Sequence, residues 1–261
     1  MKIDFQKIKE LNDYINTFKN EKLISVYSQI DKDFELKFTH ESTKIEGNTL
    51  SIFEVKTILE DGYSVAGKEL REIYEVINNK NAFEFIKEMI KKGDELTEEK
   101  IKDIHEIVVQ NIFQGGIYRN VNVKITGASF SPPEFTKVRE EMKNFIFDYE
   151  NNKKNLNPIE LASFTHAEFV RIHPFNDGNG RTSRLLMNYC LMKNGFKPIS
   201  INPEERNKYY EFLDFYGKNK NMRSLKDFIT FLIEKEYKIL LEYEKEIEFL
   251  KDNEIEKEIE F

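Results

Sequence analysis

The chain has 261 residues and a mass of 31.1 kDa, enough for one large domain or two small ones. Its net charge of -7 and pI near 5.4 argue against nonspecific nucleic-acid binding, because such binding needs a basic face. The single cysteine, Cys190, excludes an internal disulfide and a cysteine-rich zinc site, and we expect it to be buried. No secretory leader and no apolar run of membrane-spanning length is visible, so we expect a cytoplasmic protein without membrane contact.

The N-terminal half is predicted to be helical. Apolar residues at helical spacing predict a helix within residues 1–30 and a second over 34–46, which Gly47-Asn48 ends. Three more helices are expected, separated by a break at 62–67 and a turn at 93–94. Their ranges are 51–59, 69–92 and 97–109.

Residues 121–126, in the middle of the chain, lack the helical spacing of the N-terminal half. Residues 121–126 alternate apolar and polar side chains with period two, which predicts a strand. We expect a short β-hairpin that turns near Gly127 and ends before Pro132-Pro133.

Two further helices are predicted to flank a glycine-containing loop. The run Asn157-Pro158-Ile159-Glu160 combines an N-cap, a first-turn proline and a capping box, and the helix should end near Ile172. Pro174 disfavours helical geometry at His173, so this histidine should lie at a helix end. The next helix is expected over 181–193 and others over 205–216 and 225–241, followed by an acidic tail with helical spacing.

The stretch from His173 to Arg184 reads HPFNDGNGRTSR and concentrates the chemistry of the chain. Its glycine-containing loop opens onto a helix N-terminus, which attracts anions and allows a phosphate to approach the backbone. Arg181 and Arg184 are three residues apart, so both can reach phosphate oxygens. Asp177 beside a phosphate site suits Mg²⁺, and His173 can accept a proton at neutral pH.

Other metal and nucleotide sites fit less well. An EF-hand beginning at Asp177 would put Arg181 and Asn188 at ligand positions, and neither the Walker pattern nor the dinucleotide-binding pattern occurs. His40 and His105 lack a second histidine at ligand spacing and are interpreted as structural or exposed. A metal triad of His166, His173 and Asp177 is the weaker alternative to a packed His166.

The twelve residues match every specified position of the signature H-P-F-x-[DE]-G-N-G-R-x-x-R and so resemble the Fic family. The resemblance implies that His173 is the general base and that Asp177 binds Mg²⁺. It also implies phosphate contacts for Arg181 and, at the γ-phosphate, for Arg184. Three residues would form the anion hole, namely Gly178, Asn179 and Gly180.

A second motif of the family precedes the first. Residues 42–47 match [ST]-x-x-x-E-[GN], the inhibitory motif, with Ser42 and Glu46 at its specified positions. The resemblance implies that Glu46 pairs with Arg184 and keeps ATP out of the productive pose. In similar proteins this glutamate can also direct water at the AMP–protein bond, and both roles stay open here.

Two more regions receive roles through the resemblance. The predicted hairpin corresponds to the family flap, where an exposed edge aligns the target segment, with Lys124, Ile125 and Thr126 as its contact residues. An ordinary connecting hairpin is the alternative. Tyr209 and Tyr210 are expected to close the nucleotide pocket.

We therefore predict an all-α, Fic-type helical domain with a small β-hairpin flap. Its parts are N-terminal helices over 1–95 with the inhibitory helix at about 36–47, a catalytic core over 96–235 and a charged helical tail over 236–261. The predicted activity is transfer of AMP from Mg-ATP to a Ser, Thr or Tyr hydroxyl of a target protein, including the protein itself. The apolar spacing in the tail permits a homodimer contact, and a solvated terminal helix is the alternative. A de-AMPylase, a transferase for another nucleotide and a nucleotide-binding regulator without turnover are the alternatives.

Overall fold

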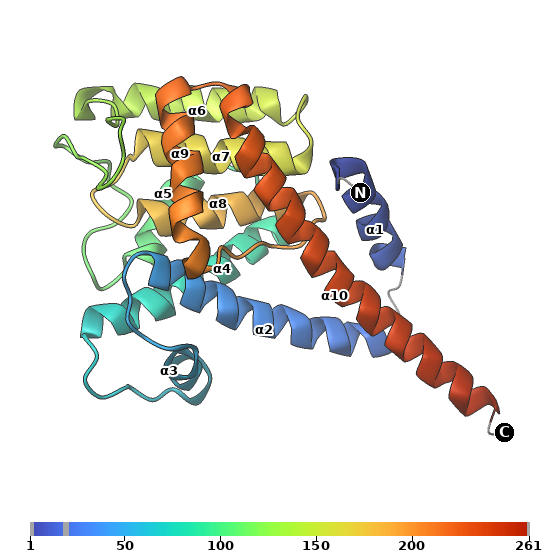
Figure 1. The fold of residues 1–261 in the computed structure, drawn as a ribbon. Helices are drawn as coiled ribbons and strands as arrows, with labels where there is room; N and C mark the ends of the chain where they lie inside the picture. The colour runs from blue at the N-terminus through green and yellow to red at the C-terminus, as the bar shows by residue number, and fades with distance from the viewer. Residues whose placement is uncertain (1–2, 18–20, 260–261) are drawn as a thin grey trace.

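The computed structural model describes residues 3–17 and 21–259, and the predictions for residues 1–2, 18–20 and 260–261 lie outside this range. Within it every regular element is a helix, which confirms the all-α class (Figure 1). The α-helices are α1 (Phe5–Thr17), α2 (Glu21–Ile45), α3 (Ile52–Lys56), α4 (Leu70–Lys92), α5 (Glu98–Val108), α6 (Val138–Asn152), α7 (Pro158–Ile172), α8 (Asn179–Lys193), α9 (Arg206–Asn219) and α10 (Lys226–Ile259). A π-helical turn (Thr57–Asp61) follows α3, and three short 3-10 turns are Phe135–Lys137, Pro203–Glu205 and Met222–Leu225.

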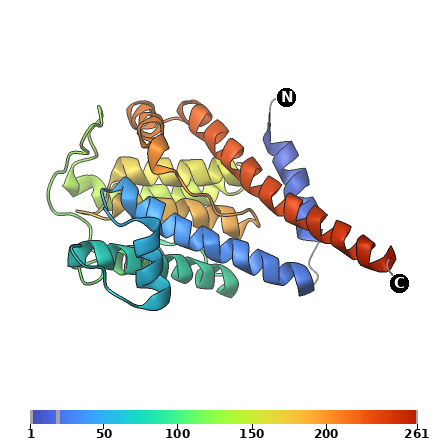
Figure 2. The ribbon, with the colours of Figure 1, turned by 60° about the horizontal axis from the view of Figure 1, so that its bottom comes forward.

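Helices α7 and α8 pack against each other at the centre of the molecule. Helix α6 covers α7, and α4 and α5 lie against α8, while α9 and α10 cross the side of this stack (Figure 1). The N-terminal α2 contacts both α4 and α8, and it crosses the face that is turned forward in Figure 2. Within the described ranges, no helix has the length and apolar character needed to cross a membrane.

Local signals set the ends of the two central helices. Asn157 Oδ1 accepts hydrogen bonds from the backbone N–H groups of residues 159 and 160, both at 3.0 Å, and Glu160 Oε2 accepts from Asn157 N at 3.1 Å. The predicted capping box is thus confirmed. His173 ends α7 in the left-handed region with φ of 50°, just before Pro174. The loop from His173 therefore leads straight into the N-terminus of α8.

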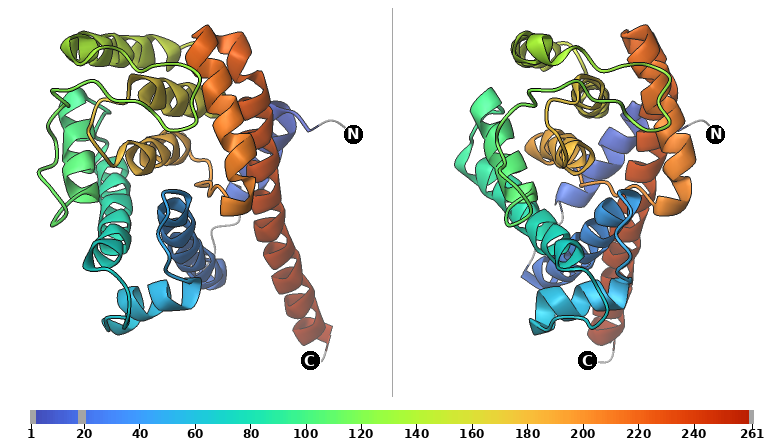
Figure 3. Two further views of the ribbon diagram at one scale, coloured as in Figure 1. Left: turned by 60° about the vertical axis from the view of Figure 1, so that its left-hand side comes forward. Right: turned by 90° about the vertical axis from the view of Figure 1, so that its left-hand side faces the viewer.

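Helix α2 ends beside α8. After Ile45 the chain turns at Gly47, whose φ of 108° favours glycine. Asn48 then ties the turn to α4, because its Nδ2 donates to Glu72 O at 3.0 Å and to Glu75 Oε2 at 3.1 Å. The segment after α2 is consequently tied to α4, and the views in Figure 3 show α2, α4 and α8 close together.

The predicted β-hairpin is wrong. Residues 121–134 form an irregular loop, and no residue in the described part of the chain is in a strand. The expected turn is present, since Ala128 N donates to Ile125 O at 3.1 Å with Gly127 at φ of 83°. The loop is instead held by side chains, because Arg119 donates to Val121 O at 2.9 Å and to Pro133 O. Period-two alternation therefore did not produce a ladder here.

Candidate active site

A cavity of about 320 Å³ lies between α7, α8, α9 and the loop around Gly127. It brings together eight of the residues that the sequence singled out: His173, Gly180, Arg184, Glu46, Ile125, Thr126, Tyr209 and Tyr210. Six predicted residues are not part of its lining, namely Ser42, Gly178, Asn179, Arg181, Asp177 and Lys124. A potential base, a helix N-terminus and a buried cation thus share one cavity.

His173 lines this cavity from the end of α7. Its ring Nδ1 lies 3.4 Å from Val170 O, and its carbonyl accepts a hydrogen bond from Arg119 Nε at 2.9 Å. Burial lowers the pKa of His173, so the imidazole is neutral near pH 7. A neutral imidazole can accept a proton from a hydroxyl group.

Side chains behind the cavity hold the loop after His173. Asn179 Nδ2 donates to Phe175 O at 2.8 Å, and Asn179 Oδ1 accepts from Phe175 N at 3.0 Å. His105 stacks on the Phe175 ring at 3.6 Å, and its Nε2 bonds Asp177 O at 2.9 Å. Because His105 Nδ1 accepts from Gly116 N at 3.0 Å, Nε2 is the donor. Asn179 therefore stabilises the loop through its side chain. Burial also lowers the pKa of His105 to about 4.

Arg184 is buried and is hydrogen-bonded to the end of α2. Its Nε donates to Ser42 Oγ at 3.0 Å, and its Nη2 donates to Ser42 O at 2.7 Å and to Glu46 Oε1 at 2.8 Å. Burial alone would lower the pKa of Arg184, but the Glu46 carboxylate outweighs it and the pKa is raised. The ion pair that the inhibitory motif implies is present. Gly180 makes room for it, since a Cβ there would lie 2.1 Å from Glu46 Oε1.

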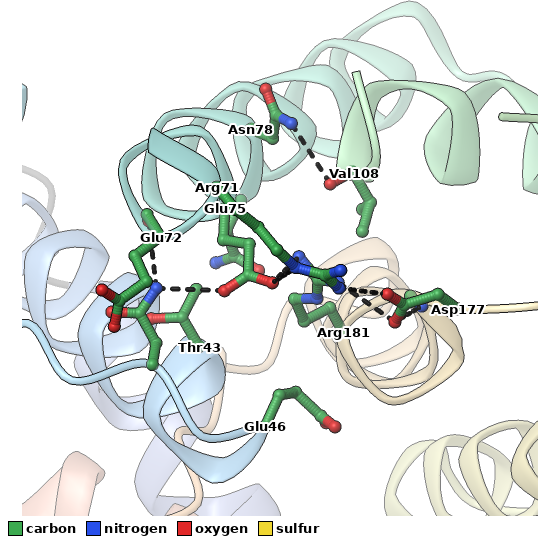
Figure 4. Close-up of polar contacts among 12 residues, drawn as sticks. Thr43, Glu46, Arg71, Glu72, Glu75, Asn78, Val108, Asp177 and Arg181 are labelled. Atoms are coloured by element: carbon green, nitrogen blue, oxygen red, sulfur yellow. Dashed lines mark hydrogen bonds and ion pairs between the residues drawn. The ribbon is translucent and has the colours of Figure 1, made fainter. Parts of the chain in front are cut away.

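Arg181 is also buried, but it is partnered much less completely. Its Nη2 lies 3.4 Å from Asp177 Oδ1, and its Nη1 lies 3.6 Å from Glu75 Oε1 (Figure 4). Among the residues that the structure describes, its Nε and Nη1 find no hydrogen-bond partner. Buried guanidinium N–H groups without an acceptor are costly, and an anion such as phosphate would accept from them.

Asp177 lies at the start of α8, outside the cavity lining. Its Oδ1 accepts from Gly178 N at 2.5 Å, and its Oδ2 accepts from Arg71 Nη2 of α4. No group of three or more His, Cys, Asp or Glu residues able to hold a metal occurs within residues 3–17 and 21–259, which argues against the triad with His166 and His173. A single carboxylate beside a phosphate site still fits Mg²⁺, which takes most of its ligands from phosphates and water.

Two tyrosines of α9 border the cavity in different ways. Tyr209 is buried, and its hydroxyl bonds His166 Nε2 at 2.8 Å. Burial lowers the pKa of His166 to about 3, as expected for a packed neutral histidine. Tyr210 is half-buried, and the Arg206 guanidinium lies 5.2 Å from its ring centre.

The loop around Gly127 is fastened to α9. Ser129 donates from its backbone N at 2.6 Å and from its Oγ at 2.5 Å to the two oxygens of Asp214. The Phe130 ring fills the space that a side chain at Gly217 would need, 2.3 Å from the ideal Cβ position. Ile125 and Thr126 are thereby held at the cavity, whereas Lys124 is exposed and does not line it.

Sequence reasoning missed Arg71 and Glu75, which reach the site from α4. No local signal identifies them, because they are more than 100 positions away from Asp177 along the chain. Arg206, Phe130 and Asp214 were likewise assigned no role, since only the folded chain brings them to the cavity.

Comparisons with known proteins agree with this geometry. The family model described as Fic/DOC family matches residues 95–191. The chain is 31% identical over 236 residues to the protein adenylyltransferase fic-1 of Caenorhabditis elegans, covering 88% of this chain and 45% of that protein. It is 33% identical over 205 residues to a protein adenylyltransferase Fic of Nematostella vectensis, covering 77% and 47%. The chain spans about half the length of the curated relatives it matches.

Solved structures share the whole arrangement of helices. A Fic domain containing signaling protein from Bacteroides thetaiotaomicron superposes with a TM-score of 0.81 at 26% identity, over 90% of this chain and 94% of that one. Residues 134–508 of C. elegans Fic-1 give a TM-score of 0.80 at 29% identity, over 94% of this chain and 72% of that one. Signature, fold and relatives together show that this chain is a Fic-domain protein of the Fic/DOC family.

Proposed function

We propose that this protein transfers AMP from Mg-ATP to a Ser, Thr or Tyr hydroxyl of a target protein. The observation that carries the proposal is the single cavity lined by His173, Gly180 and Arg184. It puts a neutral base beside a helix N-terminus and a buried cation, which suits attack of a hydroxyl on a bound phosphate. Relatives at about 30% identity are named protein adenylyltransferases, which supports the same reaction.

In the proposed reaction His173 takes the proton from the attacking hydroxyl. The hydroxyl oxygen forms a bond to the α-phosphorus while the bond from that phosphorus to the bridging oxygen breaks, and pyrophosphate leaves. Arg181, whose Nε and Nη1 lack hydrogen-bond acceptors among the described residues, supplies donors for the phosphates. Alignment and charge neutralisation carry most of such a transfer.

Asp177 is the residue that we propose to hold Mg²⁺. When bound, Mg²⁺ neutralises the phosphates and stabilises the charge that develops on the leaving group. Asp177 is suited to this role because it lies two residues before the start of α8 and its side chain is 39% exposed, next to Arg181.

We further propose that Glu46 restrains the enzyme. Its carboxylate pairs with Arg184 at 2.8 Å, so the guanidinium is not free for the γ-phosphate. The Glu46 side chain is 32% exposed, and it follows the last residue of α2, so it can swing away without disrupting a core. ATP would bind productively only when this pair opens.

The test uses ATP labelled at the α-phosphate and, separately, at the γ-phosphate. Purified Glu46→Gly and Glu46→Gly/His173→Ala proteins are incubated with each ATP and Mg²⁺, and label is followed on the protein and on lysate proteins. We expect transfer of the α-label only, in the Glu46→Gly protein only. Transfer of the γ-label would show phosphoryl transfer instead, and no label from either ATP would remove the proposed activity.

Removal of AMP is a second candidate activity. It is favoured by one observation, that Glu46 lines the same cavity as His173 and could direct water there. Release of AMP from pre-labelled protein by the wild type, lost in Glu46→Gly, would support it. Release that is equally fast in the Glu46→Gly protein would contradict a role of Glu46 in removal.

A further inference from the structure

The first turns of α4 reach the loop that precedes α8 (Figure 4). Arg71 and Glu75 are four residues apart, so their side chains leave α4 on the same face. Arg71 Nη2 donates to Asp177 Oδ2, and Arg71 Nε donates to Glu75 Oε1 at 3.2 Å. The guanidinium of Arg71 is therefore held between two carboxylates, one of them at the proposed metal site.

Both oxygens of Asp177 are engaged by donors of the protein. Oδ1 accepts from Gly178 N at 2.5 Å and lies 3.4 Å from Arg181 Nη2, while Oδ2 accepts from Arg71. A divalent cation needs a carboxylate oxygen directed at it, and a guanidinium at contact distance repels it. While Arg71 is paired with Asp177, the carboxylate charge is neutralised and attracts an incoming metal ion less strongly.

Arg71 and Arg181 differ in their freedom to move. The Arg71 side chain is 51% exposed, so it can leave Asp177 for solvent without opening a packed core. The Arg181 side chain is 1% exposed and has no such route. Of the two arginines that contact Asp177, Arg71 is consequently the one that can move into solvent.

Glu75 fixes the direction of Arg71. It is buried, and its Oε2 accepts a hydrogen bond from Asn48 Nδ2 at 3.1 Å. Asn48 follows Glu46 by two residues, so the turn that presents Glu46 to Arg184 also supports the carboxylate that orients Arg71. The contact with Asp177 is thus a built feature of the fold rather than a chance meeting of surface charges.

We propose that Arg71 is a positioning residue that covers Asp177 and has to be displaced when a divalent cation enters with the nucleotide. The inference rests on the proposed function, because that function assigns Mg²⁺ to Asp177. Its consequence is a second restraint, separate from the Glu46–Arg184 pair, that sets the Mg²⁺ concentration needed to load the site.

The test measures binding rather than turnover. A fluorescent α,β-methylene analogue of ATP is added to Glu46→Gly protein, and Mg²⁺ is titrated until binding is half-maximal. We expect Arg71→Gln in this background to lower the half-maximal Mg²⁺ concentration about twofold to fivefold, the effect of an exposed ion pair worth up to about 1 kcal/mol. Arg71→Lys keeps the charge and should restore at least part of the original midpoint.

Lys91→Gln is the matched control, because it removes the same charge from the exposed last turn of α4. It should leave the midpoint unchanged. An unchanged or higher midpoint in Arg71→Gln would overturn the inference, as would Mg²⁺-independent binding in the Glu46→Gly parent. Absence of AMP transfer despite Mg²⁺-dependent binding would remove the proposed function alone, since the comparison of midpoints would still stand.

Discussion

Arg181 and Arg184 lie on neighbouring turns of α8 and are both 1% exposed, yet their surroundings are opposite. Arg184 makes three hydrogen bonds of 2.7 to 3.0 Å, to Ser42 and Glu46 at the end of α2. Arg181 has two long ion pairs, and in the described part of the chain two of its nitrogen atoms stay without a hydrogen bond.

Arg184 is already bound by protein acceptors, whereas Arg181 still has N–H groups without an acceptor. A buried guanidinium without full partners carries a desolvation cost that an anionic ligand would relieve. A buried guanidinium that already holds a carboxylate gains little from the ligand unless that ion pair breaks. Arg181 is therefore suited to bind phosphate directly, whereas Arg184 becomes available only after Glu46 has moved.

The largest expected effect concerns His173, which lines the same cavity as Arg184. In the Glu46→Gly background, His173→Ala should lower the rate of AMP transfer about a hundredfold to ten-thousandfold, because general-base assistance is lost. Initial rates with α-labelled ATP check this. A loss of less than about threefold would mean that His173 does not take the proton.

The two arginines should differ in their contribution to stability when no nucleotide is present. Arg184→Met removes three buried hydrogen bonds and should lower the free energy of unfolding by about 2 to 3 kcal/mol. Arg181→Met removes an incompletely partnered charge and should change it by less than about 1 kcal/mol. Urea unfolding of both variants makes the comparison, and equal losses would contradict it.

A smaller effect is expected at Gly180. A Cβ there would lie 2.1 Å from Glu46 Oε1, so Gly180→Ala should push the carboxylate away from Arg184. We expect a loss of about 1 kcal/mol in the wild type and clearly less in the Glu46→Gly background. A double-mutant cycle from urea unfolding measures the difference, and identical losses would show that Glu46 is not the group displaced.

The smallest effect concerns pH. Burial lowers the pKa of His173, so its neutral form persists below the ordinary value of 6.5. The negative charge of Glu46 raises that pKa, and its removal in Glu46→Gly lowers it further. Transfer by Glu46→Gly should therefore decline only as pH falls below 6.5, which a pH profile of initial rates tests. A decline centred above 6.5 would contradict the assignment.

The parts of the site that the sequence predicts best are those set by local signals. The capping box at Asn157 and the proline after His173 fix α7, and the glycine loop fixes the start of α8. The contact between Glu46 and Arg184 followed from two family motifs rather than from the spacing of residues. Local signals do not predict which side chains contact Asp177, because Arg71 belongs to a helix far away in the sequence.

Two errors have different causes. The hairpin was predicted from alternation over 121–126, but the loop bonds through Arg119 and Asp214 rather than through a partner strand. Helix α6 was not predicted, although Val138, Met142, Phe145 and Tyr149 follow a helical spacing and are all buried. In the first region tertiary contacts override the local pattern, whereas in α6 the local spacing and the structure agree.

The restraint of Arg184 by Glu46 is tested most directly by comparing the rate of AMP transfer with and without Glu46. The rate of AMP incorporation from α-labelled Mg-ATP is measured for Glu46→Gly and for wild type under the same conditions. Opening the pair should raise the rate at least about tenfold, the effect of freeing a buried cation worth more than 1.4 kcal/mol to the transition state. Equal rates in the two proteins would contradict the restraint.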